Sequence, residues 1–271
     1  MTFAATPSSR SEDRRISPVF WVLLAVLGTS GWAVYSGYGN MRFGIFLFVI
    51  AGWMVSLCLH EYAHARTALH GGDISVGAKG YLTLNPMKYA NVLLSFVLPI
   101  VFMILGGIGL PGGSVWIERH RIQGRLKHSL ISAAGPLVNL VAAVLILVPV
   151  GAGWLDDPKV NTVWQGYELQ VSPLALALGF LGMLQLSATL LNLLPVPGLD
   201  GYGIIEPWLS YRTRRAVEPF APYGMLAVFA LLWQPAVNQW FFEAVYGAME
   251  LLGVDRVYAQ IGRELFSFWR G

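Results

Sequence analysis

Long apolar runs alternate with short polar stretches along the chain. Each long run has about the length of a helix that crosses a bilayer, which needs about 20 predominantly apolar residues. The long runs cover residues 18–38, 43–69, 92–115, 130–150 and 173–194, and a shorter pair, 223–233 and 236–252, is split by Pro235. This pattern predicts an all-α polytopic membrane protein with about five to six transmembrane helices.

The composition agrees with the pattern and excludes a soluble protein. Hydrophobic residues make up 55% of the 271 residues and charged residues 12%, whereas soluble domains carry about 25% charged residues. The net charge of +3 does not indicate a nucleic-acid partner, because the basic residues cluster beside the apolar runs, as positive-inside topology produces. We therefore expect a lipid bilayer around the protein. Cys58 is the only cysteine, so no disulfide framework forms, and we expect it to pack as a small apolar residue.

The run at residues 92–115 differs from the other runs because several prolines and glycines interrupt it. Charge counting places the basic loops at 119–127 and 212–215 on the cytoplasmic side and the acidic loop at 156–168 outside. With a cytoplasmic N-terminus, this arrangement requires residues 92–115 to enter the membrane and return. We therefore favour a re-entrant segment there over a full span.

The segment between the second run and this re-entrant segment is also unusual. Residues 73–91 alternate loosely between apolar and polar side chains and contain Asn85-Pro86, which predicts a short extended or hairpin segment. Such a segment would offer an edge to which an extended substrate could add as a strand. Overall, we expect a cytoplasmic tail at 1–17, a membrane-embedded domain at 18–252 with its motif-bearing core at 43–210, and a C-terminal tail at 253–271.

The second run ends in the motif His60-Glu61-x-x-His64. Two histidines at positions i and i+4 share one face of a helix, so both imidazoles can reach a single Zn²⁺, and Glu61 beside them can act as a general base toward water. The five-residue pattern alone is a weak signal. Its place in an apolar run strengthens it, because ionisable side chains in a membrane segment are energetically costly and usually functional.

A catalytic zinc site needs a third protein ligand, and the chain offers two candidates. His70 nearly completes a HExxHxxGxxH pattern, but Thr67 stands where that pattern has glycine. On a continuing helix His70 lies about 15 Å along the axis from His60, so we expect a surface histidine. Asp200 follows Pro195 and Pro197, which cannot continue the preceding helix. It is either a ligand or a solvated carboxylate at the helix end.

Three ordered motifs together resemble the site-2 protease family of intramembrane zinc metalloproteases, in its compact bacterial subgroup without a PDZ domain. The resemblance covers residues 52 to 210, and Leu82-Thr83-Leu84-Asn85-Pro86 adds to it. The motifs are His60-Glu61-x-x-His64, Gly135-Pro136-x-x-Asn139 and Asn192-x-x-Pro195-x-Pro197-x-Leu199-Asp200-Gly201.

The resemblance implies that His60, His64 and Asp200 bind one Zn²⁺ and that Glu61 activates water for peptide hydrolysis. Asn192 would hold the substrate or the developing oxyanion, although an asparagine that caps a broken helix is the other interpretation. Gly135, Pro136 and Asn139 would serve close packing and bending beside the site rather than chemistry.

The resemblance further implies a transmembrane protein or peptide as substrate, and a multi-pass protein of the bacterial plasma membrane with a cytoplasmic N-terminus. Two other functions use the same polar groups. A metal transporter would be built from internal repeats, and the sequence shows none. A catalytically inactive scaffold that binds membrane helices would have no need of the intact Glu61.

Overall fold

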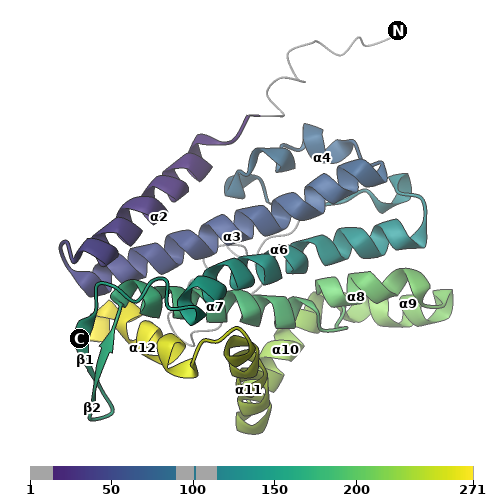
Figure 1. Ribbon diagram of the computed structural model, residues 1–271. Helices are drawn as coiled ribbons and strands as arrows, with labels where there is room; N and C mark the ends of the chain where they lie inside the picture. Colours follow the sequence, from purple (N-terminus) through teal and green to yellow (C-terminus); the bar gives the residue numbers. More distant parts are fainter. Residues whose placement is uncertain (1–14, 90–100, 102–114, 271) are drawn as a thin grey trace.

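Long helices lying side by side form the body of the protein (Figure 1). The computed structural model describes residues 15–89, 101 and 115–270. Five helical segments in this part of the chain are long and apolar enough to cross a membrane. They are α2 (Pro18–Ser36), α3 (Met41–Gly71), α6 (Arg125–Gly151), α7 (Pro173–Asn192) and the segment Tyr211–Leu232. The expectation of an all-α polytopic membrane protein is confirmed.

Capping side chains start α2, α3 and α7 where the sequence turns apolar. Ser17 and Ser172 accept backbone N–H groups at the starts of α2 and α7, and a proline follows each of them at the first helical position. Asn40 caps α3 in the same way. Gly72 ends α3 with a φ of 122°, as glycine does at helix ends. The boundaries therefore follow from local chemistry.

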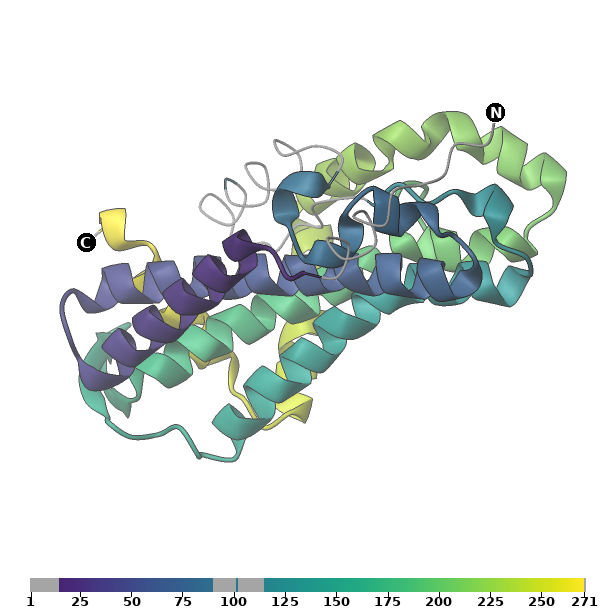
Figure 2. The same ribbon diagram turned by 90° about the horizontal axis from the view of Figure 1, so that it is seen from above.

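Helix α7 is the central element, and 83% of its most apolar 18-residue stretch is buried. It packs against α3, α6, α11 and α12 (Figures 1 and 2). Small residues allow these close approaches: a Cβ added at Gly182 would lie 2.4 Å from Leu147 of α6, and one at Gly179 would lie 2.7 Å from Tyr258 of α12. Because α7 ends only one short loop before Asp200, its tight packing helps to fix that residue relative to α3 and α6.

Shorter elements occupy the loops and the C-terminal third of the chain. A two-stranded antiparallel hairpin follows α6, with Gln165 and Gly166 at positive φ in its turn. The apolar pattern of the sequence does not predict this hairpin, and residues 256–266 of the expected C-terminal tail form a packed helix. The elements are β1 (Val160–Trp164), β2 (Tyr167–Val171), α8 (Asp200–Ile205), η5 (Glu206–Trp208), α9 (Tyr211–Val217), η6 (Glu218–Tyr223), α10 (Gly224–Leu232), α11 (Pro235–Leu251), α12 (Arg256–Phe266) and η7 (Phe268–Arg270).

The expectation of an extended or hairpin segment at 73–91 is wrong for the residues described there. This region forms short helical turns, namely α4 (Ser75–Ala78), η1 (Tyr81–Thr83) and η2 (Pro86–Lys88). Positive φ values at Gly80 and Leu84 break any strand, and Leu84 turns into a cluster with Phe20 and Cys58. The loose alternation thus reflects turns packed on α3. The re-entrant segment expected at 92–115 lies almost entirely outside the described residues.

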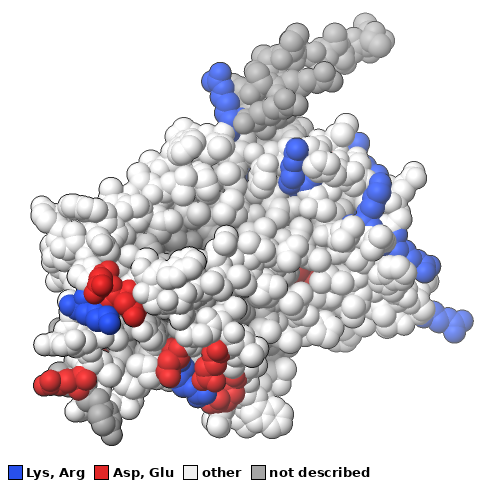
Figure 3. Space-filling view, viewed as in Figure 1, with Lys and Arg blue, Asp and Glu red and all other residues white. Residues whose placement is uncertain are grey.

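Charge is distributed unevenly over the surface. In Figure 3, most of the visible Lys and Arg side chains lie at the upper and right-hand parts of the molecule, toward the end that carries α9. Most of the visible Asp and Glu side chains lie at the left and lower parts of this face. The two ends of the helix bundle therefore differ in charge.

Candidate metal centre

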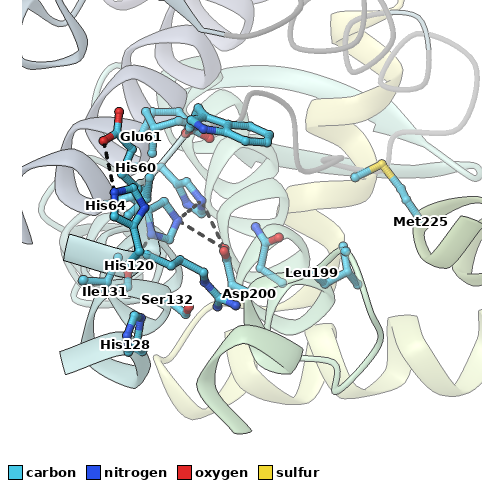
Figure 4. A pocket seen from close by; sticks show the side chains of 17 residues that line it. His60, Glu61, His64, His120, His128, Ile131, Ser132, Leu199, Asp200 and Met225 are labelled. Atoms are coloured by element: carbon cyan, nitrogen blue, oxygen red, sulfur yellow. Dashed lines mark hydrogen bonds and ion pairs between the residues drawn. The ribbon is translucent and has the colours of Figure 1, made fainter. Parts of the chain in front are cut away.

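Two histidines and one aspartate converge where α3, α6 and α8 meet (Figure 4). The Nε2 atoms of His60 and His64 lie 3.1 Å apart, and Asp200 Oδ2 lies 3.4 Å from each of them. Both histidines are buried, with exposed fractions of 5% and 6%. Within the described residues, these are the three side chains whose ligand atoms gather closely enough to hold one metal ion.

The separations of 3.1–3.4 Å are close to those in the coordination sphere of zinc. Tetrahedral zinc with bonds of 2.0–2.2 Å to nitrogen and oxygen places neighbouring ligand atoms roughly 3.3–3.5 Å apart. Two imidazoles and one carboxylate also form a donor set that zinc accepts, with a fourth position left for water or substrate. Burial alone raises the pKa of Asp200, but the two imidazoles that face it lower this pKa below its usual range. The carboxylate is therefore ionised, as a ligand must be.

Helix α6 orients both imidazole rings from behind. Nδ1 of His60 lies 2.8 Å from Asn139 Oδ1, and Nδ1 of His64 lies 2.7 Å from the carbonyl oxygen of Ile131. Both partners accept hydrogen bonds, so each Nδ1 donates and each Nε2 keeps its lone pair for the metal. Gly135 stands between these two residues on the same face of α6. A Cβ added there would lie 2.2 Å from His64 Nε2, which explains the close packing expected at this glycine.

The chain after α7 turns Asp200 back toward these histidines. Helix α7 ends at Asn192, and Gly198 takes a φ of 92° before Leu199 becomes extended. Asp200 is then the first residue of α8. Gly201 allows the turn to close, because a Cβ there would lie 2.2 Å from the carbonyl oxygen of Leu193. The two prolines noted in the sequence thus stop α7, and the glycines allow the return.

A pocket of about 840 Å³ opens beside the three ligand atoms, and Glu61 and Asn192 line it. Glu61 is 3% exposed and Asn192 also 3%. One carboxylate oxygen of Glu61, Oε2, accepts the backbone N–H of Val115 at 3.1 Å. The arrangement therefore combines a buried carboxylate, an amide and a potential metal site around one cavity.

Residues 115–120 form one wall of this pocket, and no motif in the sequence had assigned this segment to the site. Glu118 lies at the centre of this strap. It forms ion pairs with Lys79 and Arg121, and its own backbone N–H bonds the carboxylate of Asp73. These partners, Arg121 first, lower the pKa of Glu118 to about 2. Arg119 forms a further ion pair with Glu206 of η5. Backbone contacts such as that of Val115 leave no signal in a sequence.

His70 does not belong to the site. It is exposed, and its Nδ1 lies 2.8 Å from the carbonyl oxygen of Arg66 in its own helix. The structure brings all five expected polar groups of α3, α7 and α8 together around one cavity, namely His60, Glu61, His64, Asn192 and Asp200.

Comparison with known proteins identifies the family. The chain is 45% identical over 262 residues to "Putative zinc metalloprotease Rip2" of Mycolicibacterium smegmatis, which covers 95% of this chain and 96% of the relative. It is 41% identical to the protein of the same name from Mycobacterium tuberculosis, over 97% of each chain. The chain belongs to the site-2 protease family. It is accordingly an intramembrane zinc metalloprotease, and its cofactor is zinc.

A more distant relative covers less of the chain. "Putative zinc metalloprotease YwhC" of Bacillus subtilis is 28% identical over 193 residues, which are 69% of this chain and 81% of the relative. No family model and no solved structure matches the chain.

Proposed function

We propose that His60, His64 and Asp200 hold the catalytic zinc and that Glu61 is the general base. On this proposal the protein hydrolyses peptide bonds within or near transmembrane segments of other membrane proteins. The observation that carries the assignment is the gathering of three ligand atoms within 3.1–3.4 Å of one another, in the same pocket as Glu61. Zinc at these ligands supplies Lewis acidity, which lowers the pKa of water toward about 7 and polarises a peptide carbonyl.

The residues of this chain perform the remaining steps. Glu61 takes a proton from the attacking water and passes it to the amine that leaves. The N–H of Val115 holds one oxygen of its carboxylate, so the other oxygen is available for this transfer. Asn192, on the last turn of α7, donates its side-chain N–H toward the oxygen on which negative charge develops.

The substrate assignment follows from where the site lies. His60 and His64 stand in the second half of a 31-residue apolar helix. A transmembrane helix shields its backbone carbonyls in internal hydrogen bonds, so a substrate segment must unwind before it reaches Glu61. A pocket of about 840 Å³ accommodates several residues of extended chain rather than an intact helix.

We also propose that the N-terminus and the site face the cytoplasm of a bacterial cell. The backbone N–H of Ser17, just before α2, bonds the carbonyl of Thr83 at 2.8 Å, so the start of α2 lies at the same end of the bundle as the turns after α3. Most of the visible Lys and Arg side chains lie toward the end that carries α9 (Figure 3). Positive-inside topology places such an end in the cytoplasm.

The test compares membranes of cells that express wild type or Glu61→Gln. Mass spectrometry would score new peptide termini that fall inside transmembrane segments. We expect such fragments with wild type and with Glu218→Gln, an exposed glutamate outside the pocket of the metal centre, but not with Glu61→Gln. Metal analysis of the purified variants serves as the control, because Glu61→Gln should retain zinc. Unchanged fragments with Glu61→Gln would refute the assignment of Glu61 as the general base.

A further inference from the structure

A second pocket, of about 430 Å³, lies between the start of α3, α7, α11 and α12. Three arginines line it: Arg42 in the first turn of α3, Arg263 in α12 and Arg270 in η7. Glu264 is the one carboxylate among the described residues around it. Three arginines against one glutamate leave the pocket with a net charge of +2.

Among the residues that the structure describes, these arginines have no carboxylate partner. Within the described part of the chain, none of the three forms an ion pair with a carboxylate, whereas Arg256 on the same helix α12 forms two, with Glu243 and Glu250. Partial desolvation, together with the like charge of Arg270, lowers the pKa of Arg263. Arg42 stands at the positive end of the α3 dipole, where a cation is unfavourable. All three positions therefore favour a bound anion.

The pocket also has an apolar wall. Met183 of α7 and Phe242 and Tyr246 of α11 line it, and the two aromatic rings lie 6.0 Å apart. Met183 is ten residues into α7, about 15 Å from the start of that helix. Helices α3 and α7 begin at the same end of the bundle, since Gly52 faces Leu181 and Ser56 bonds Gln185. The pocket thus extends from the end of the apolar segments toward their middle.

Aromatic side chains mark this end as the level of the lipid headgroups. Trp32, Tyr35 and Tyr38, near the end of α2, are exposed, and Trp269 lies next to Arg270. Tryptophan and tyrosine concentrate at this level in membrane proteins. Arginine is also well suited to phosphate, because its planar guanidinium donates two parallel hydrogen bonds.

We propose that this pocket binds the phosphate headgroup of an anionic phospholipid, with the acyl chains along the wall of Met183, Phe242 and Tyr246. The site is separate from the metal centre, since Arg42 and His60 are 18 residues apart on α3, about 27 Å. A bound lipid joins α3, α11 and α12 at the end of the bundle opposite to the site. The apolar wall favours a lipid over free phosphate, because free phosphate has no acyl chains to pack against this wall.

The test is a titration of the full-length protein in uncharged detergent, followed by native mass spectrometry. The probes are phosphatidylglycerol and phosphatidylcholine, with inorganic phosphate in a parallel arm. We expect phosphatidylglycerol to bind more tightly than phosphatidylcholine. Arg270→Gln should weaken phosphatidylglycerol binding about fivefold, and the triple variant with Arg42→Gln and Arg263→Gln roughly a hundredfold. Glu264→Gln should strengthen it, because this change raises the positive charge of the pocket.

A matched control replaces Arg212, Arg214 and Arg215, three exposed arginines of α9, with glutamine. This control variant should bind phosphatidylglycerol as tightly as wild type does. In both proteins, added phosphatidylglycerol should slow the hydrogen exchange of residues 256–270. Equal binding of the two lipids by wild type, or unchanged binding by the triple variant, would overturn the proposal. Binding of inorganic phosphate without phosphatidylglycerol would also overturn it, in favour of a free anion. If the triple variant fails to fold, Arg270→Gln alone still tests the proposal, because Arg270 is exposed and its replacement should not disturb folding.

Discussion

Gly135 is the residue whose replacement should damage the metal centre most selectively. In a helix, alanine is favoured over glycine by about 1 kcal/mol, so Gly135→Ala should not weaken α6 itself. The new Cβ, however, would lie 2.2 Å from His64 Nε2 and 2.4 Å from His60 Nε2. These values are close to a zinc–nitrogen bond of 2.0–2.1 Å. The methyl group would therefore stand as near to both nitrogens as the metal should.

The two imidazole rings cannot move away from the new methyl group without losing hydrogen bonds. Each ring is held by a hydrogen bond from Nδ1, to Asn139 and to the carbonyl of Ile131, and both partners belong to the same helix as Gly135. Breaking both bonds costs about 1–3 kcal/mol. Since about 1.4 kcal/mol corresponds to a tenfold change, we expect zinc affinity to fall about 10–100-fold, as it does when residues that orient metal ligands are lost.

The assay is a zinc titration of purified protein against a competing chelator, with thermal unfolding measured in parallel. Gly28→Ala in α2 is the matched control, because a Cβ there meets nothing within 4 Å. It should bind zinc as wild type does and cleave membrane substrates normally. If Gly135→Ala bound zinc with wild-type affinity while folded, the placement of His60 and His64 around a metal at this glycine would be refuted.

Three further predictions concern the same region. Asn139→Leu keeps the size of the side chain but removes the partner of His60, so zinc affinity measured by chelator competition should fall about 10–100-fold without loss of the folded state. Asp200→Asn removes a ligand charge outright, and its zinc content after dialysis should be lower than that of Asn139→Leu. The pKa of Glu118 is lowered to about 2 from 4.5, chiefly by Arg121, so the stabilisation of the strap by this carboxylate should be complete above pH 4.5 and disappear as pH falls toward 2. Hydrogen exchange of residues 115–121 in wild type and Glu118→Gln would measure this, and equal pH profiles would contradict it.

Much of the bundle could be predicted from the sequence because apolar length and capping residues act locally. The apolar runs at 18–38, 43–69, 130–150 and 173–194 became α2, α3, α6 and α7 with small shifts of their ends. The prediction for residues 73–91 was wrong because the alternation of apolar and polar residues there is too irregular to distinguish a strand from consecutive turns. Its buried apolar residues Val76, Tyr81, Leu84 and Tyr89 are spaced by five, three and five positions, which suits turns that pack on α3 rather than a pleated strand.

The site was predictable to the extent that its groups are side chains with a fixed spacing. His60 and His64 share a face because of the helical period. The sequence predicted only a packing role for Asn139, whereas its side-chain oxygen accepts a hydrogen bond from His60 Nδ1 and orients that ring. A polar side chain in an apolar span, one turn after a glycine, was the available signal. The carbonyl of Ile131 and the N–H of Val115 left none, because every residue carries both groups.

The contrast between the two halves of α3 explains how one helix serves both the fold and the site. Its first half packs apolar residues such as Ile45, Val49 and Trp53 into the main core with α7. Its second half carries His60, Glu61 and His64, whose burial would be costly if they lacked partners. Helix α6 supplies the partners of the two imidazoles through the 131, 135 and 139 face, where only a glycine lets the backbones approach. The two imidazoles are thus tolerated in the bundle because α6 supplies their hydrogen-bond partners, and the same contacts leave both Nε2 atoms directed at Asp200.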